Sequence, residues 1–283
     1  MSKFASQLRL ARRLCGASLT GVALCTPAHA QFAAAVTPPR FEISVEPGKV
    51  TRQVMEITHA IPGTGAYRVY TADWNLDATG ALTFYDTLQP GGCRPWVAIE
   101  RKEVNVAQGA RVRYRFEVAA PADAPDRECR FALMIESKPQ EVQANASASF
   151  PMSGRIAVIV YVRVGAAKAV LEAGDTSIAA IDGRPTPMLM VRNAGNATGR
   201  LSGVLKGTDA TGATIEFTPE SVPILPDTVR KIALQAYQPG PRTAASVPPA
   251  LKWPLALRGV LEYGHDAAGR IEVDRKISER PAQ

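Results

Sequence analysis

The sequence has 283 residues, 46% of them hydrophobic, and this length is sufficient for two domains that each bury a core. Its formal charge of +7 includes four basic and no acidic side chains within residues 1–30, so the remainder carries +3. That excess is too small to indicate a protein that binds nucleic acid or anionic lipid.

Residues 1–30 have the layout of a secretory signal peptide. A basic start is followed by an apolar segment from Leu14 to Cys25 and then by Ala28-His29-Ala30. The apolar segment is too short to span a bilayer, and no later stretch approaches that length. We therefore predict cleavage after Ala30 and a periplasmic protein without direct membrane insertion. Lipidation at Cys25 is the second reading.

A short turn sequence occurs twice. Residues 77–81 and 209–213 both read Asp-Ala-Thr-Gly-Ala, and each copy precedes an apolar segment. Asp favours turns and Gly accepts a positive φ, so each copy predicts a hairpin turn that leads into a β-strand. The similar flanking patterns predict two related β-domains in tandem.

The clearest strands alternate between apolar and charged residues. In 111–118 one face carries Val112, Tyr114, Phe116 and Val118. In 128–136 one face carries Cys129, Phe131, Leu133 and Ile135. We predict that these two strands pair and share one core. Trp74 is predicted to fill the interior of that core, as a Trp on a middle strand does in immunoglobulin-like sandwiches.

Two cysteines remain after removal of the leader. In an oxidising compartment, Cys93 and Cys129 predict one disulfide. The alternative is a metal site, but these two thiols and the two remaining histidines, His59 and His265, show no ligand spacing. We therefore expect no metal.

The segment 155–165 is the most continuously β-branched part of the chain. It is apolar on both faces for much of its length, which is typical of an interior strand. The other reading is an edge strand whose exposed side is meant for a partner. The small, polar stretch before it, 137–154, is predicted to be a mobile loop.

The first half of the chain resembles the PapD-like periplasmic pilus chaperones. The resemblance rests on "VEPGKVTRQVMEITH", "PWVAIERKEVNVAQGARVRYRFEV" and "DRECRFALMIESKP". Its most specific part is Asp126-Arg127-Glu128 leading into an apolar strand that Pro139 closes. The segments "NAGNATGRLSGV" and "PESVPILPDTVRKI" are similar to the second domain of that family.

The resemblance implies an all-β fold of two tandem immunoglobulin-like β-sandwich domains, at 31–165 and 166–283, after a cleaved signal peptide. It also implies that the last strand of the first domain is donated to a secreted pilus or fimbrial subunit. The donated side chains would be Ile156, Val158, Val160 and Val162.

The family also binds the carboxylate at the end of its subunit with basic residues. The candidates in this chain are Arg40 and Arg155, although neither is in register with the family pattern. An outer-membrane usher is the second partner that the resemblance implies.

The sequence lacks several common catalytic motifs. The sequence contains no Gly-x-Ser-x-Gly elbow, no phosphate-binding loop and no His-Glu-x-x-His pattern. We therefore predict a protein that is not an enzyme and has no cofactor. The leading hypothesis is a periplasmic chaperone that acts by strand donation. The alternative is a non-catalytic envelope scaffold or adhesion protein that buries segment 155–165 internally.

Overall fold

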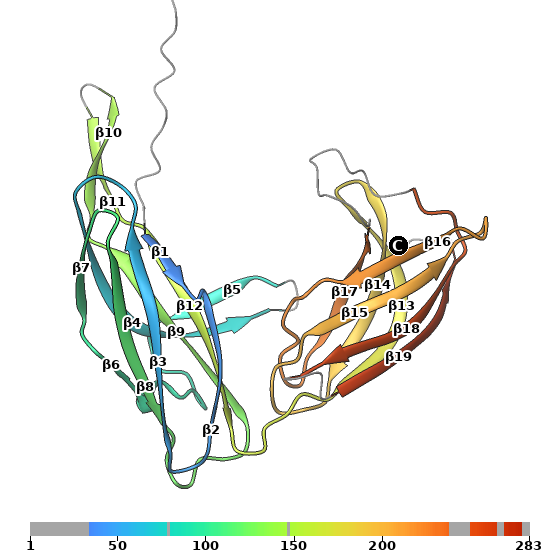
Figure 1. Cartoon of the computed structure of the whole chain (residues 1–283), viewed down its shortest axis with the longest axis horizontal. Coiled ribbons are helices and arrows are strands. Elements are labelled where there is room, and N and C mark those ends of the chain that lie inside the picture. The colour runs from blue at the N-terminus through green and yellow to red at the C-terminus, as the bar shows by residue number, and fades with distance from the viewer. Residues whose placement is uncertain (1–33, 78–79, 146–147, 238–249, 265–268, 279–283) are drawn as a thin grey trace, which may run out of the picture. The chain divides into compact units, whose positions relative to one another are not determined.

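The computed structural model describes residues 34–77, 80–145, 148–237, 250–264 and 269–278. Within these ranges the regular structure consists of β-strands and one short 3-10 helix, η1 (Arg94–Trp96) (Figure 1). Two β-sandwiches follow one another along the chain, each around its own hydrophobic core, so the predicted all-β class is confirmed. The predicted signal peptide, His265 and most of the tail lie outside the described residues.

The first sandwich consists of two sheets. The four-stranded sheet has the order β1-β3-β8-β6, with the bounds Ala34–Thr37, Val50–His59, Arg111–Ala119 and Val97–Ile99. The six-stranded sheet has the order β2-β12-β9-β4-β5, with β7 also paired to β4. Its strands are β2 (Arg40–Val45), β12 (Arg155–Val164), β9 (Glu128–Ser137), β4 (Thr64–Leu76), β5 (Leu82–Tyr85) and β7 (Glu103–Ala107).

Two prolines move the chain from one sheet to the other. β1 pairs with β3, and Pro38-Pro39 then separates it from β2, which pairs with β12. Because proline has no N–H, neither residue can donate a backbone hydrogen bond to a neighbouring strand. The first strand of the sandwich is thereby divided between the two sheets.

The apolar faces of β8 and β9 meet in one core, as the alternating patterns predict. Phe116 and Phe131 are both buried, and the ring centroid of Phe116 lies 5.1 Å from that of Phe41 and 6.1 Å from that of Phe131. The predicted pairing of these two strands is wrong, however. β8 pairs with β3 and β6, so it faces β9 across the core instead of lying beside it. Alternation identifies the buried face of a strand but not its neighbour.

The predicted place of Trp74 is also wrong. Its side chain is buried, but in a second apolar cluster with Ala132, Met134 and Tyr161, on the opposite face of the six-stranded sheet. The cause is the period of two along β4: Tyr67 and Val69 point into the main core, and Trp74 has the other parity. The indole N–H donates to the carbonyl of Phe131 at 3.0 Å.

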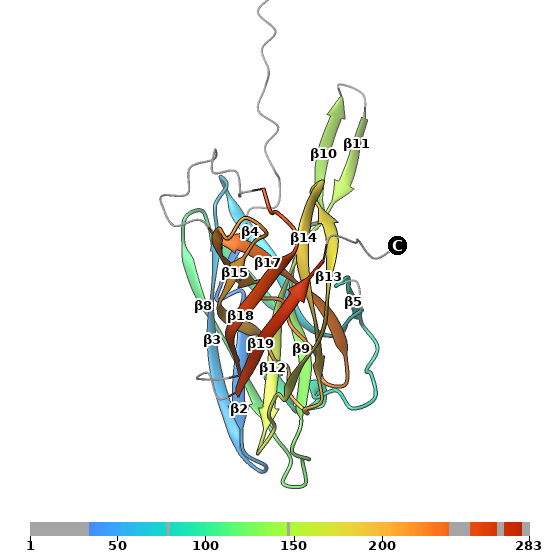
Figure 2. The same cartoon turned by 90° about the vertical axis from the view of Figure 1, so that its right-hand side faces the viewer.

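The stretch predicted to be a mobile loop contains a β-hairpin. β10 (Gln140–Asn145) pairs antiparallel with β11 (Ala148–Met152). Both views show this hairpin projecting beyond the end of the sandwich, in continuation of β9 and β12 (Figures 1 and 2). Small polar residues without strict alternation gave no strand signal in the sequence.

The second sandwich is built from seven strands in the order β13-β14-β17-β16-β15-β18-β19. One strand serves both of its layers. The first part of β17 pairs with β14 through Ala233, and the part from Leu234 onward pairs with β16. The strand bounds are β13 Leu171–Ile181, β14 Arg184–Asn193, β15 Leu201–Thr208, β16 Thr214–Pro219, β17 Val229–Tyr237, β18 Leu255–Tyr263 and β19 Gly269–Ile277.

The repeated turn sequence forms a hairpin turn in each sandwich, as predicted. The first copy connects β4 to β5 and the second connects β15 to β16. Asp77 Oδ1 accepts from the N–H of Ala81 at 2.9 Å, and Asp209 Oδ1 accepts from the N–H of Ala213 at 3.0 Å. The glycine of each copy has a positive φ, 95° and 83° respectively, which explains why Gly stands there.

The predicted disulfide between Cys93 and Cys129 is present, with a Cα–Cα distance of 5.7 Å. It connects β9 to the segment that precedes η1. Strands of the first sandwich end at Val164, and those of the second begin at Leu171. The domain limits 31–165 and 166–283 remain a prediction.

Removal of this disulfide is expected to destabilise the protein substantially. The bond closes a loop with a sequence separation of 36 residues. Constraint of the unfolded chain by such a loop contributes about 2–4 kcal/mol. We expect the double variant Cys93→Ala/Cys129→Ala to lose that amount of unfolding free energy in urea titrations. An unchanged urea midpoint would show that the bond is dispensable.

Candidate functional site

Strand β12 has two neighbours over only part of its length. β9 pairs with it antiparallel from Arg155 to Arg163, whereas β2 pairs with it in parallel from Ile159 to Val164. Within the described residues, the edge of 155–158 that faces away from β9 therefore has no strand partner. The strand is interior over its second part and an edge over its first four residues.

The four predicted donor residues lie on the face of β12 that points into the first sandwich. Val158, Val160 and Val162 are fully buried in its core, and Ile156 is half-buried against it. Ile156 and Val158 belong to the open edge, while Val160 and Val162 lie where β2 covers the strand. Their role in binding stays a prediction.

Two exposed apolar side chains precede the open edge on β11. Phe150 and Met152 are 44% and 45% exposed. Phe150, Met152, Gly154, Ile156 and Val158 are alternate residues of one stretch of the chain. Large exposed apolar residues that continue a buried apolar face are typical of a binding surface.

The outward face of β12 carries a second apolar cluster. Tyr161 is buried there, and its ring packs edge-on against Trp74 with a centroid distance of 5.4 Å. Ala157 and Ile159 pack against the same cluster. Burial raises the pKa of the Tyr161 hydroxyl above its ordinary value, so this group stays protonated and able to donate at neutral pH.

The two predicted anchor arginines lie on this outward face but are not brought together. Arg40 is level with Ile159 in the parallel ladder, four residues along β12 from Arg155. At about 3.3 Å per residue, this places the two positions about 13 Å apart along the strand. Arg155 donates to the hydroxyl of Tyr70 at 3.3 Å, and Arg40 pairs with Glu42 at 3.0 Å.

Three arginines converge on the carboxylate of Glu42. Besides Arg40, Arg163 lies 3.2 Å from Glu42 Oε2 and Arg200 lies 3.3 Å from Glu42 Oε1. Arg200 also donates to the Tyr161 hydroxyl at 3.0 Å. Sequence reasoning missed this cluster, because it joins residues up to 158 positions apart and alternation reports only the face of each one.

Glu128 is a buried carboxylate on β9. Its side chain is 1% exposed and accepts hydrogen bonds from the N–H of Thr198 at 2.9 Å and from Thr198 Oγ1 at 2.5 Å. Burial raises the pKa of Glu128 above its ordinary value, and the bonds from Thr198 oppose that rise. Arg130 Nη1 lies 4.0 Å away, and burial lowers its pKa.

The described residues hold no group of three or more His, Cys, Asp and Glu side chains that could bind a metal ion. His59 is buried, and its Nδ1 lies 2.6 Å from the hydroxyl of Tyr67. This contact gives the buried Nδ1 a hydrogen-bond partner. In the described part of the chain, no helix is long and apolar enough to cross a bilayer.

Glu128 gives the stability of the protein a specific dependence on pH. An unfolded Glu loses its proton near pH 4.5, whereas folded Glu128 keeps its proton to higher pH. The folded state then binds more protons than the unfolded state, so stability falls as pH rises through the folded-state pKa. We expect Glu128→Gln to remove part of this fall in urea unfolding measured from pH 4 to pH 7. Glu46→Gln, at an exposed position, is the control; identical pH profiles for all three proteins would contradict the assignment.

No family model matches the sequence, and no curated protein matches it. Solved structures with a similar arrangement include the YadV chaperone, at 10% identity over 87% of this chain and 100% of that chain, with a TM-score of 0.45. The Pseudomonas aeruginosa CupB2 chaperone is similar at 12% identity over 85% and 99%, with a TM-score of 0.44. A complex of the Salmonella enterica SafA pilin with the SafB chaperone matches at 13% identity over 88% and 99%, with a TM-score of 0.45. The functional argument below rests on the geometry of this chain.

Proposed function

We propose that this protein is a periplasmic chaperone that binds a secreted pilus or fimbrial-type subunit by β-strand addition. The observation that carries the proposal is the open edge of β12 over Arg155–Val158. An unpaired strand edge offers backbone donors and acceptors to an incoming chain, and it is an aggregation hazard unless a partner uses it. An outer-membrane usher is a second partner within the same proposal.

The side chains at this edge suit a partner that lacks part of its own core. Phe150 and Met152 are exposed, and Ile156 is half-buried at the margin of the first core. All three lie within the short segment 150–156, so one bound subunit could contact them together. We therefore place the main donated contacts on Phe150, Met152 and Ile156, and assign Val158, Val160 and Val162, which are fully buried, chiefly to the protein's own core.

A carboxylate of the subunit would bind best at Arg155. This guanidinium is exposed and lies beside the open edge. Arg40 is already engaged with Glu42. An arginine can bind a carboxylate with two parallel hydrogen bonds, which fixes the orientation of the bound chain.

The alternative is a non-catalytic scaffold or adhesion module of the cell envelope. The observation in its favour is the enclosure of Ile159–Val164 between β9 and β2. In that function the whole of β12 is structural, and the exposed residues of β11 bind no subunit.

The exposed pair on β11 allows a test that leaves the core intact. We expect the double variant Phe150→Asp/Met152→Asp to lose stoichiometric co-purification of a small secreted β-rich subunit from the periplasm of the native host. The reason is that two charges would have to be buried in the subunit. The measurement is affinity purification of the tagged mature protein followed by mass spectrometry.

The matched control is Leu88→Asp, because Leu88 is 62% exposed on the same sandwich and lies outside β11 and β12. Thermal unfolding should be nearly the same for both variants. Strand addition is refuted if the β11 variant retains the subunit, or if wild-type protein purifies without any such partner.

A second comparison examines the edge of β12 itself. Ile156 and Val112 are both half-buried against the same core, but Val112 lies on β8 in the other sheet. Each change to Asp should cost about 1–3 kcal/mol of stability. We expect Ile156→Asp to abolish capture of the subunit and Val112→Asp to preserve it, at temperatures where both variants are folded. Equal loss in both variants would assign the effect to stability alone and favour the scaffold function.

A further inference from the structure

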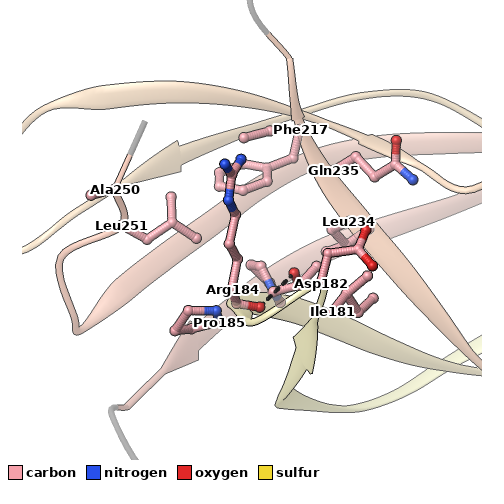
Figure 3. A pocket seen from close by; sticks show the side chains of 12 residues that line it. Ile181, Asp182, Arg184, Pro185, Phe217, Leu234, Gln235, Ala250 and Leu251 are labelled. Carbon is pink, nitrogen blue, oxygen red and sulfur yellow. Dashed lines mark hydrogen bonds between the residues drawn. The ribbon is translucent and has the colours of Figure 1, made fainter. Parts of the chain in front are cut away.

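The second sandwich contains a cavity of about 830 Å³ that opens to solvent. Its volume lies within the range of about 300–1,000 Å³ that is typical of small-molecule sites. The cavity lies far along the chain from the open edge of β12, and its function is independent of strand addition. Figure 3 shows the residues that line it, which come from β13, β14, β16, β17 and the segment at 250–251.

The cavity follows from the way β17 changes partners. β14 and β17 are paired from Met188 to Arg192, but from Leu234 onward β17 pairs with β16 instead. The segment Arg184–Pro187 of β14 and the segment Leu234–Ala236 of β17 then form the two sides of a fork. The cavity occupies this fork.

The floor and walls of the fork are mostly apolar. Phe217 and Leu234, both fully buried members of the second core, close the floor. Ile181, Pro185 and Leu251 line the more accessible walls. An aliphatic chain that entered here would extend the existing core and be removed from water.

Arg184 places a positive charge over the apolar lining of the cavity. Its side chain extends across the cavity towards Phe217 in Figure 3. No carboxylate among the described residues lies within ion-pair distance of this guanidinium, although Asp182 belongs to the same rim. An unpaired guanidinium over an apolar cavity favours a ligand with an anionic head group and an apolar tail.

The prolines of β14 argue against an added polypeptide strand at this fork. Pro185 and Pro187 both line the cavity and have no N–H. A strand entering the fork would find no backbone donor at either position. A ligand without a peptide backbone does not need these N–H groups.

We propose that this cavity binds a linear aliphatic amphiphile with an anionic head group, with the tail on Ile181, Pro185 and Leu251 and the head on Arg184. The most direct test is isothermal titration of dodecanoate into the mature protein, below the critical micelle concentration. We expect saturable binding of one molecule. Dodecyltrimethylammonium, which has the same tail and a cationic head, should bind at least about tenfold more weakly.

Three variants locate the site. Arg184→Glu should weaken dodecanoate binding about tenfold or more, and Lys206→Glu, an exposed charge reversal on β15, should leave it unchanged. Ala250→Trp, at an exposed lining position, should fill the cavity and abolish binding. Thermal unfolding verifies that each variant is folded.

The proposal is overturned if dodecanoate does not bind, or if Ala250→Trp leaves its affinity unchanged. Equal binding of both head groups together with an unaffected Arg184→Glu variant refutes the role of Arg184. A final variant replaces residues 238–249, which connect β17 to Ala250, by a Gly-Ser linker of equal length. Binding that is seen only in this variant would show that the chain's own segment is the occupant.

Discussion

The burial of the inward face of β12 is the constraint on which the first sandwich depends. Val158, Val160, Val162 and Val164 are fully buried, so the four-stranded sheet must cover this face of the strand. Its outward face is apolar as well, because Tyr161 packs against Trp74. The backbone groups on both edges of such a strand also need hydrogen-bond partners, yet Pro38-Pro39 precedes β2, which pairs only from Ile159 and leaves Arg155–Val158 without a strand on that side. The open edge is thus a consequence of how the first strand is divided between the sheets.

Charged groups on the outward face of the six-stranded sheet differ in how they are partnered within the chain. Glu42 is held by three arginines, and buried Glu128 is held by Thr198 with Arg130 nearby, so both carboxylates are compensated within the chain. Arg155 is exposed, and it has a neutral hydroxyl as its hydrogen-bond partner. The charge of Arg155 also interacts with Glu136, which lies opposite it in the β9–β12 ladder, but at an exposed position this interaction is weak and leaves the guanidinium accessible to an incoming carboxylate. This difference separates the structural arginines from the one proposed to act in binding.

The sequence predicted periodic features well and long-range neighbours poorly. Alternation identified the buried faces of β8 and β9, cysteine counting predicted the disulfide, and Asp-x-x-Gly predicted both hairpin turns. The partner of β8 and the place of Trp74 were wrong, because a period of two specifies a face but not which strand lies opposite. Alternation along β4 does place Trp74 correctly, because its odd-numbered residues Tyr67 and Val69 point into the main core and Trp74 therefore points to the opposite face. The cluster around Glu42 carries no local signal, because its members meet only after the sheet has formed.

Both sandwiches contain a strand, or two half-strands, that changes pairing partner from one layer to the other. In each, a strand or a pair of half-strands serves both layers, and an opening remains where it changes partners. At β12 the opening exposes residues with backbone N–H groups, and the next apolar side chains along the chain are exposed, so a polypeptide can pair there. At β14 two lining residues are prolines without an N–H and the accessible lining is apolar, so we propose that an apolar tail, and not a strand, binds there. We therefore propose that the presence or absence of backbone donors at each opening decides whether it suits a protein strand or a small molecule.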